Sequence, residues 1–296
     1  MSLLCGFAGF SKQSYYRPHV DGFTWQAIED LVVEYILDMR EQDPGIGLAK
    51  IWEMYCNTAN GLQIGRDRFY AIADKYKLKL RKEHRKPRTT DSRHNMPTYP
   101  NQVKDVIPTR PNQIWVADIT YIVLWGLSGG CKERFAYLSL LMDSYTKEIV
   151  GYCLCETLSA EGPLEALRQA LGRITLEQAG MLTHHSDRGC QYASFAYTNL
   201  LKEYGITVSM TESGNPKDNA QAERLNSTVK NELLKGKKFH SLEEAKDAID
   251  KAIYFYNNLR PHSSLNMMTP SQATCHEGEI TRCWKSYREE YLRGGM

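Results

Sequence analysis

Apolar positions recur at helical spacing in the first part of the chain. Between residues 24 and 80, this spacing predicts one helix from Thr24 to the residues before Pro44, a second over 48–56 and a third over 66–77. Three such helices are typical of a helix-turn-helix-like DNA-binding module with the third as its recognition helix. The alternative is a small helical bundle with a solvated basic face. A short N-terminal helical segment is predicted for 1–23.

This spacing is lost between residues 81 and 111, where prolines alternate with clusters of basic residues. Proline fixes the backbone and removes a hydrogen-bond donor, so we expect an extended linker. Its basic side chains are expected to track DNA phosphates, and a solvated tether is the alternative. The predicted DNA contacts in the third helix and the linker are Arg66, Arg68, Lys75, Lys82, Arg85, Lys86 and Arg88.

Strand patterns dominate from residue 112 onward. Runs rich in β-branched and aromatic residues predict three consecutive antiparallel strands, followed by alternating helices and strands. The predicted strands are 113–124, 134–143, 148–155, 181–184 and 206–210, and the helices are 162–172, 194–204 and one from about 217. The expected fold class is therefore α/β, with a mixed sheet over residues 112–235. A C-terminal helical extension over 236–296 opens with a capping box from Ser241 to Glu244.

Composition narrows the class of protein. The 296 residues are 42% hydrophobic, which is normal for a folded protein, and the formal net charge is only +2. Between Lys75 and Arg93, however, nine basic residues face two acidic ones, which favours a polyanionic partner. No run is long and apolar enough for a membrane span, and no signal-peptide pattern precedes the helices. We expect a cytoplasmic protein with no membrane partner, its eight scattered cysteines reduced and no structural zinc.

Three acidic residues stand in unusual surroundings. Asp118 lies within an apolar, β-prone run, Asp187 follows a predicted strand, and Glu223 lies on the predicted helix after Asn219. If the strands of Asp118 and Asp187 are neighbours, their carboxylates meet. Glu223 shares its helix face with Asn226 and Lys230, while an apolar stripe on the opposite side is able to dock on the sheet.

Carboxylates brought together repel one another, and a hard divalent cation with oxygen ligands relieves that repulsion. We therefore expect Asp118, Asp187 and Glu223 to bind Mg²⁺, with two ions and with Mn²⁺ able to substitute, for in-line phosphoryl transfer. Lys230 is expected to hold a DNA phosphate, or to be an ordinary exposed lysine. Ser186 and Gly189 are expected to shape the loop around Asp187, and Asn219 either braces Glu223 or caps its helix.

Other polar residues leave alternatives open. His184 and His185 are adjacent on a predicted strand and point to opposite faces, which argues against metal ligation by both. Arg260 and His262 either contact DNA or pack the C-terminal extension.

The motifs DITY with Asp118, HSDRGCQY with Asp187, and NPKDNAQAE with Glu223 occur in this order, followed by YNNLRPHSSL. Together they resemble the DDE transposase and retroviral-integrase superfamily, and most closely the second-frame (OrfB) transposases of the insertion-sequence three family. The resemblance is strong over 113–272 and weak over 24–80. It implies a ribonuclease-H-like catalytic core, Mg²⁺-dependent nicking at element ends, and strand transfer by the released 3′-hydroxyl.

The same resemblance implies particular partners. These are terminal inverted-repeat and target DNA, further copies of the chain assembled on DNA, and an upstream-frame protein as a partner or fusion. Such a protein would act in the bacterial cytoplasm and associate with the nucleoid when bound. Two alternatives are a regulatory protein that occupies element ends and a nuclease without strand transfer.

Overall fold

A five-stranded sheet with the order β3-β2-β1-β4-β5 forms the centre of the protein. The computed structural model describes residues 22–58, 64–80, 96–125, 134–212 and 219–294. The strands are β1 (Ile114–Leu124), β2 (Arg134–Asp143), β3 (Ile149–Cys155), β4 (Thr183–Ser186) and β5 (Thr207–Met210). β1, β2 and β3 are antiparallel neighbours, whereas β4 and β5 run parallel to β1.

This topology follows from the connections. Consecutive antiparallel strands need only turns between them, whereas parallel strands need crossovers, which helices supply here. The predicted α/β class, with a mixed ribonuclease-H-like sheet, is therefore confirmed.

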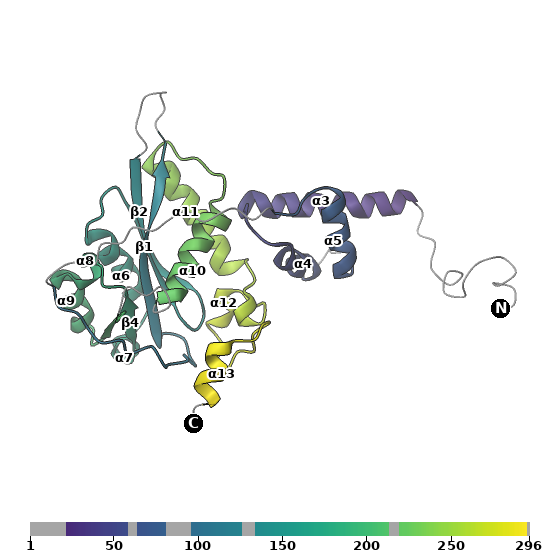
Figure 1. Ribbon diagram of the computed structural model, residues 1–296. Coiled ribbons are helices and arrows are strands. Elements are labelled where there is room, and N and C mark those ends of the chain that lie inside the picture. The colour runs from purple at the N-terminus through teal and green to yellow at the C-terminus, as the bar shows by residue number, and fades with distance from the viewer. Residues whose placement is uncertain (1–21, 59–63, 81–95, 126–133, 213–218, 295–296) are drawn as a thin grey trace, which may run out of the picture.

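Helices cover both faces of the sheet (Figure 1). One face carries α6 (Glu161–Leu171), α8 (Cys190–Ala193) and α9 (Phe195–Glu203), and α7 (Leu176–Gly180) lies at its edge. The other face carries α10 (Ala220–Thr228), a π-helical continuation η2 (Val229–Leu233), and α11 (Leu242–Asn258). Alternation along β1 sends Trp115 and Ala117 into the first core and Ile114 and Val116 into the second. Asp118 therefore faces α10.

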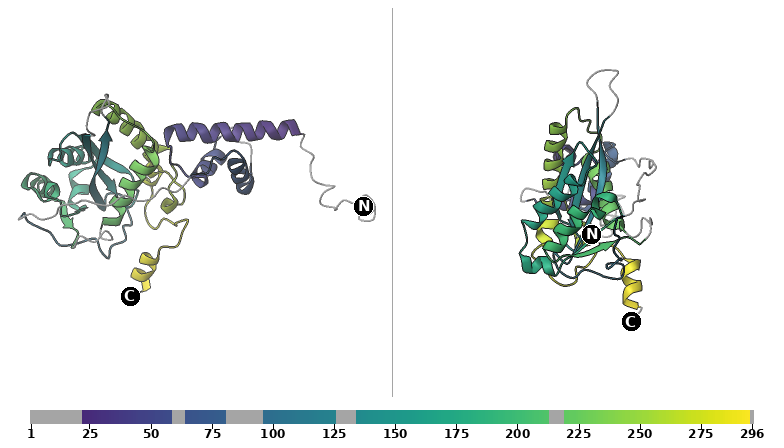
Figure 2. Two further views of the ribbon diagram at one scale, coloured as in Figure 1. Left: turned by 45° about the horizontal axis from the view of Figure 1, so that its top comes forward. Right: turned by 90° about the vertical axis from the view of Figure 1, so that its left-hand side faces the viewer.

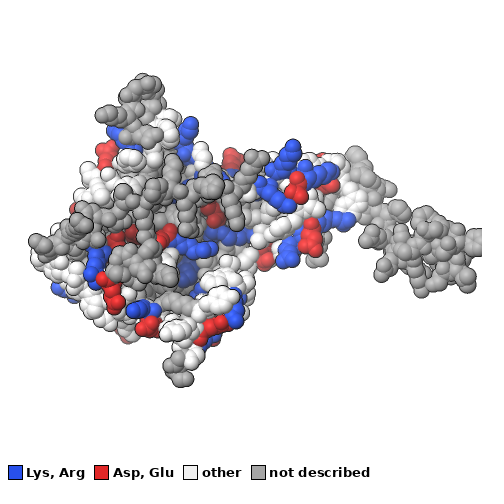
Figure 3. All heavy atoms as spheres, in the orientation of Figure 1, with Lys and Arg blue, Asp and Glu red and all other residues white. Residues whose placement is uncertain are grey.

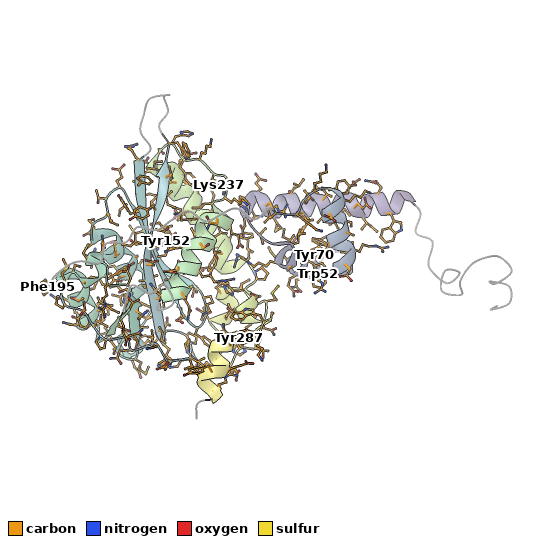
Figure 4. The ribbon with its side chains drawn as sticks, in the orientation of Figure 1. Trp52, Tyr70, Tyr152, Phe195, Lys237 and Tyr287 are labelled. Atoms are coloured by element: carbon orange, nitrogen blue, oxygen red, sulfur yellow. The ribbon has the colours of Figure 1, made fainter. Side chains whose placement is uncertain are left out.

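The helical module consists of α3 (Gly22–Gln42), α4 (Leu48–Cys56) and α5 (Arg66–Lys75). Its apolar faces meet at Ile36, Ile51 and Phe69, which have no exposed surface. Trp52 and Tyr70, labelled in Figure 4, lie on this module. The predicted helices are present, although α5 ends at Lys75 and not at residue 77.

The module meets the sheet domain at the C-terminal end of α3 (Figures 1 and 2). Buried residues of the module and of the α10 side of the sheet form one continuous hydrophobic cluster. The module is thus packed against the sheet domain.

Part of the segment predicted as an open linker also packs against the sheet domain. The Tyr99 ring lies against the core on the α6 side, and the backbone nitrogen of Gln102 donates to Ser209 Oγ on β5 at 2.8 Å. Tyr99, Val103 and Val106 bury apolar surface here. The linker was predicted from its prolines and basic residues, and that prediction did not take this apolar surface into account. The predicted segment 1–23, apart from its last two residues, and the linker residues Lys82, Arg85, Lys86 and Arg88 lie outside the described residues.

The C-terminal extension wraps the α10 side of the sheet. After α11 come η3 (Ser263–Leu265), α12 (Pro270–Ala273) and α13 (Tyr287–Gly294). The Ser241 hydroxyl accepts from the backbone nitrogen of Glu244, as the predicted cap requires. The Glu244 carboxylate instead accepts from the backbone nitrogen of His240, so the capping box is not reciprocal. In the described parts of the chain, every helix is too short or too polar to cross a membrane.

Candidate active site

Asp118 and Asp187 are brought together by the pairing of β1 with β4. These parallel strands place Ala117 opposite Ser186, so the next residue on each chain is one of the two acids. β4 ends at Ser186, beyond the predicted end at His184, and Asp187 is the first residue after it. The two strands are therefore neighbours, which is the condition under which the sequence brings the acids together, and both carboxylates lie at the C-terminal end of β4.

Glu223 is positioned by two asparagines on its own helix. Asn219 Nδ2 donates to the Ala117 carbonyl at 3.1 Å, and Asn226 Nδ2 donates to Asp118 Oδ2 at 2.8 Å. Both asparagines lie about one helical turn from Glu223 and share its face. That face is therefore directed at β1, and it is not the open surface that the sequence suggested, because Asn219 and Asn226 are both buried.

The pKa of Asp118 shows that the three acids interact. This pKa is raised from 3.8 to about 7, first by burial and then by the charges of Asp187 and Glu223. The backbone N–H of Ile119 and the side chain of Asn226 act in the opposite direction by stabilising the ionised form. The ionised form of Asp118 is therefore disfavoured by burial and by the two neighbouring acids.

The turn after β4 fixes the direction of Asp187. The Gly189 backbone nitrogen donates to Asp187 Oδ1 at 2.9 Å, and Ser186 Oγ donates to the Asp187 carbonyl at 3.0 Å. A Cβ on Gly189 would lie 2.9 Å from Asp187 Oδ1. The turn therefore leaves no room for a side chain at Gly189, which supports the predicted role of both residues in shaping this loop.

Asn219 braces the start of α10 and does not cap it. It occupies the N-cap position, but its side chain makes no capping hydrogen bond. The bond to Ala117 instead pins the beginning of the helix to β1.

The chemistry of this group suits a hard divalent cation. Its donors are carboxylate oxygens, the ligands that Mg²⁺ and Mn²⁺ prefer, and their mutual repulsion is what bound positive charge relieves. Over the described ranges, no three Asp, Glu, His or Cys side chains already converge as a ligand set. Asp118, Asp187 and Glu223 thus lie close enough to interact electrostatically, but their side chains do not converge on a single metal position.

The two histidines before Asp187 are engaged elsewhere. His184 Nε2 lies 2.8 Å from the Tyr197 hydroxyl, and His185 Nδ1 lies 2.9 Å from Ser209 Oγ. Burial and the neighbouring His185 lower the pKa of His184 to about 3, so it is neutral. Both rings therefore bond to neighbouring side chains, which argues against the metal ligation that the sequence left open.

The predicted DNA contacts differ in how they are held. Lys230 is exposed on η2, and the Arg66 side chain is 67% exposed. By contrast, the Arg68 guanidinium lies 3.8 Å from the Trp25 ring centroid, and Lys75 pairs with Glu29 at 2.5 Å. Figure 3 shows basic side chains on the helical module with acidic ones among them.

Arg260 and His262 pack the C-terminal extension. Arg260 is only 4% exposed, and its Nε donates to Glu232 Oε1 at 2.7 Å. His262 accepts hydrogen bonds from Ser264 at the start of η3. Of the two roles that the sequence left open for Arg260 and His262, the structure supports packing of the C-terminal extension.

The reading of the sequence missed two polar contributions. Asn226 was placed on the Glu223 face, but its bond to Asp118 was not anticipated. Its spacing of one turn from Glu223 was the available signal. The Tyr192 hydroxyl is buried, has no partner among the described residues, and interacts electrostatically with Asp118 and Asp187.

Comparisons with known proteins identify the family of this chain. Two models of the family described as "Integrase core domain" match residues 108–216 and 204–270. The uncharacterized 31 kDa protein of insertion element IS600 from Shigella sonnei is 34% identical over 272 residues, covering 90% of this chain and 96% of the relative. The transposase for IS629 from the same organism is 29% identical and covers 91% and 90%.

Two further similarities are more partial. The putative transposase of IS150 from Escherichia coli K12 is 36% identical over 174 residues, which is 58% of each chain. The magnesium-bound catalytic core of HTLV-2 integrase superposes with a TM-score of 0.41 at 20% identity, covering 56% of this chain and 97% of that one. Identity above 30% across nearly the whole of the IS600 relative places this chain in one family with it. The chain therefore belongs to the DDE transposase and integrase superfamily of DNA polynucleotidyl transferases, as an insertion-sequence transposase of the insertion-sequence three type.

Proposed function

We propose that Asp118, Asp187 and Glu223 form the active site of a transposase that nicks DNA at insertion-sequence ends and joins the released 3′-hydroxyl to target DNA. The observation that carries this proposal is geometric: the pairing of β1 with β4 sets Asp118 beside Asp187, and the Asn226 bond holds the Glu223 helix against Asp118. The raised pKa of Asp118, caused by burial and then by the charges of Asp187 and Glu223, agrees with this geometry. Acids that repel one another at the centre of the sheet are an arrangement that structural stability alone does not favour.

These three carboxylates would hold Mg²⁺, with two ions expected and with Mn²⁺ able to replace them. When bound, the metal supplies positive charge to the attacking and leaving oxygens of an in-line phosphoryl transfer. The protein side chains do the positioning. Gly189 orients Asp187 through its backbone nitrogen, and Asn226 favours the ionised form of Asp118.

Lys230 supplies a DNA contact on the same continuous helix as Glu223. Lys230 is an exposed residue, although partial burial lowers its pKa, and a phosphate bound there would lie along the helix that carries the acid. Arg66 and the linker residues would extend this contact, while Arg68 and Lys75 would first have to leave Trp25 and Glu29. Cleavage at two element ends requires two active sites, so we expect several copies on DNA in the bacterial cytoplasm. An upstream-frame partner remains part of this proposal.

The test uses the full chain, Mg²⁺, and duplex DNA carrying the terminal repeats of the element. Nicks at the 3′ ends followed by joined products are the expected result. Nicks without joining would instead indicate a nuclease, and tight end binding without nicks would indicate a regulatory protein. Both outcomes contradict the proposed strand transfer.

A further inference from the structure

The helix that carries Glu223 continues without interruption to a second acidic residue. α10 ends at Thr228, and η2 follows directly from Val229 to Leu233, so Glu223 and Glu232 lie on one hydrogen-bonded helix, residues 220–233. A π-helical turn inserts extra backbone into a helix and is frequent at functional sites. A displacement of Glu232 would therefore act on the same helix that carries Glu223.

Glu232 binds two cations that come from opposite ends of the sequence. Its Oε1 accepts from Arg260 Nε at 2.7 Å and from Lys50 Nζ at 3.0 Å. Lys50 belongs to α4 of the helical module, whereas Arg260 follows α11. One carboxylate thus joins three parts of the fold.

A second acid completes what we call the dock cluster, which consists of Asp43, Lys50, Glu232 and Arg260. Asp43 has no exposed surface, and its Oδ2 lies 3.7 Å from Arg260 Nε. Burial and the neighbouring Glu232 raise the pKa of Asp43, while Arg260 and Lys50 lower the pKa of Glu232 against the effect of burial. Charges enclosed in this way must stay paired, which makes their positions strongly determined.

The backbones of the module and of the Glu223 helix also touch at this point. The Gly45 nitrogen donates to the Glu232 carbonyl at 2.7 Å, and a Cβ on Gly45 would lie 2.1 Å from Glu232 Cα. Lys237, labelled in Figure 4, lies beside the end of α3, and burial lowers its pKa. The contact is therefore a closely fitted joint and not a loose tether.

We propose that Glu232 is a positioning residue through which the helical module sets the place of the Glu223 helix, so that phosphoryl transfer depends on the docked module. This inference rests on the proposed function for its catalytic consequence only. The physical coupling between Lys50 and residues 220–233 stands on the dock cluster itself. DNA bound to the helical module would thereby change the position of Glu223 without any DNA contact from Glu232.

Amide hydrogen exchange on the full chain tests the coupling without reference to activity. Lys50→Met removes the ammonium but keeps an extended side chain. Lys79→Met is the matched control, because Lys79 pairs with Asp74 inside the same module, at 2.9 Å and on the surface. We expect exchange over residues 220–233 to rise by about tenfold in Lys50→Met and to stay unchanged in the control. Unchanged exchange in both variants overturns the proposal.

A double-mutant cycle then tests the catalytic consequence with DNA at saturation. Nicking rates are measured for Lys50→Met, Glu232→Gln and the double variant, beside a control cycle that pairs Glu232→Gln with Lys79→Met. We expect the Lys50→Met/Glu232→Gln double variant to nick no more slowly than the slower of its two single variants. In the control cycle, we expect the rate reductions of the two single variants to multiply. Multiplying effects in both cycles would overturn the catalytic coupling. A wild-type chain that makes no nicks would refute the proposed function, while the exchange result still decides the coupling.

Discussion

Asn226 Nδ2 donates a hydrogen bond of 2.8 Å to Asp118 Oδ2 and thereby ties the Glu223 helix to the central strand β1. The bond has two effects. It fixes the distance between the two elements that carry Asp118 and Glu223. It also stabilises the ionised form of a carboxyl whose pKa burial and the neighbouring charges of Asp187 and Glu223 raise to about 7.

Replacing Asn226 by alanine is expected to shift the pH dependence of nicking. Loss of the donor raises the pKa of Asp118 further. The acid limb of the rate profile therefore moves upward by about one to two pH units, since a hydrogen bond to a charged group contributes roughly 1.5–3 kcal/mol. Asn231→Ala is the control, because Asn231 bonds only Ser227 on the exposed side of the same helix. An acid limb that stays in place in Asn226→Ala would refute this role.

Asp118→Asn is expected to stabilise the metal-free protein at high pH. The folded-state pKa lies above the ordinary value of 3.8, so wild-type stability falls as pH rises from there through about 7. The variant lacks this loss and should be more stable above pH 7 by no more than about 4 kcal/mol, with no advantage near pH 4. Thermal unfolding at both pH values measures the difference. A less stable variant at high pH would contradict the burial of a repelled charge.

Gly189→Ala should damage activity far more than stability. The added Cβ would meet Asp187 Oδ1 at 2.9 Å and push the carboxylate aside. A misplacement of this kind costs about 100-fold in rate. Gly180→Ala, where a Cβ meets nothing within 4 Å, controls for the loss of glycine. Equal nicking rates in the two variants would show that the turn does not position Asp187.

Gly45→Ala tests the close approach of the helical module to Glu232. Because the new Cβ would lie 2.1 Å from Glu232 Cα, the joint must open, at a cost of about 1–3 kcal/mol in unfolding free energy. Gly47→Ala, in the same turn with nothing within 4 Å of its Cβ, should cost less than about 1 kcal/mol. Denaturant unfolding that finds no difference between them would mean that the module does not contact η2 so closely.

The sheet was predictable because its strands carry their own signals. Alternation in β1 to β3 and the short apolar runs of β4 and β5 are local patterns, and the family motifs fixed which strands carry the acids. The π-helical turn η2 was not predictable, because the hydrogen-bond pattern there depends on what the helix packs against. The packing of Tyr99 was also not predicted, because the prolines around it suggested an open tether.

At the site, the surroundings of Asp118 and Asp187 in the sequence singled them out, and their meeting depended on their strands being neighbours. The partners of the polar residues could not be predicted. Sequence spacing places Asn226 near Glu223 without showing that it reaches across to Asp118. Likewise, an arginine in YNNLRPHSSL reads equally well as a DNA contact or as a buried ion pair. Only the three-dimensional position of Glu232 decides between them for Arg260.

The central claim is that Asp118, Asp187 and Glu223 together carry the phosphoryl transfer, and nicking of terminal-repeat DNA tests it most directly. Rates are compared in Mg²⁺ for Asp118→Asn, Asp187→Asn and Glu223→Gln. Glu165→Gln on the far face is the control, since Glu165 is exposed and pairs with Arg168 at the surface. Each acid variant should lose at least about 100-fold while the control keeps its rate, because a carboxylate that holds the metal contributes several kcal/mol. Nicking and joining that survive in any one of the three variants would contradict the account.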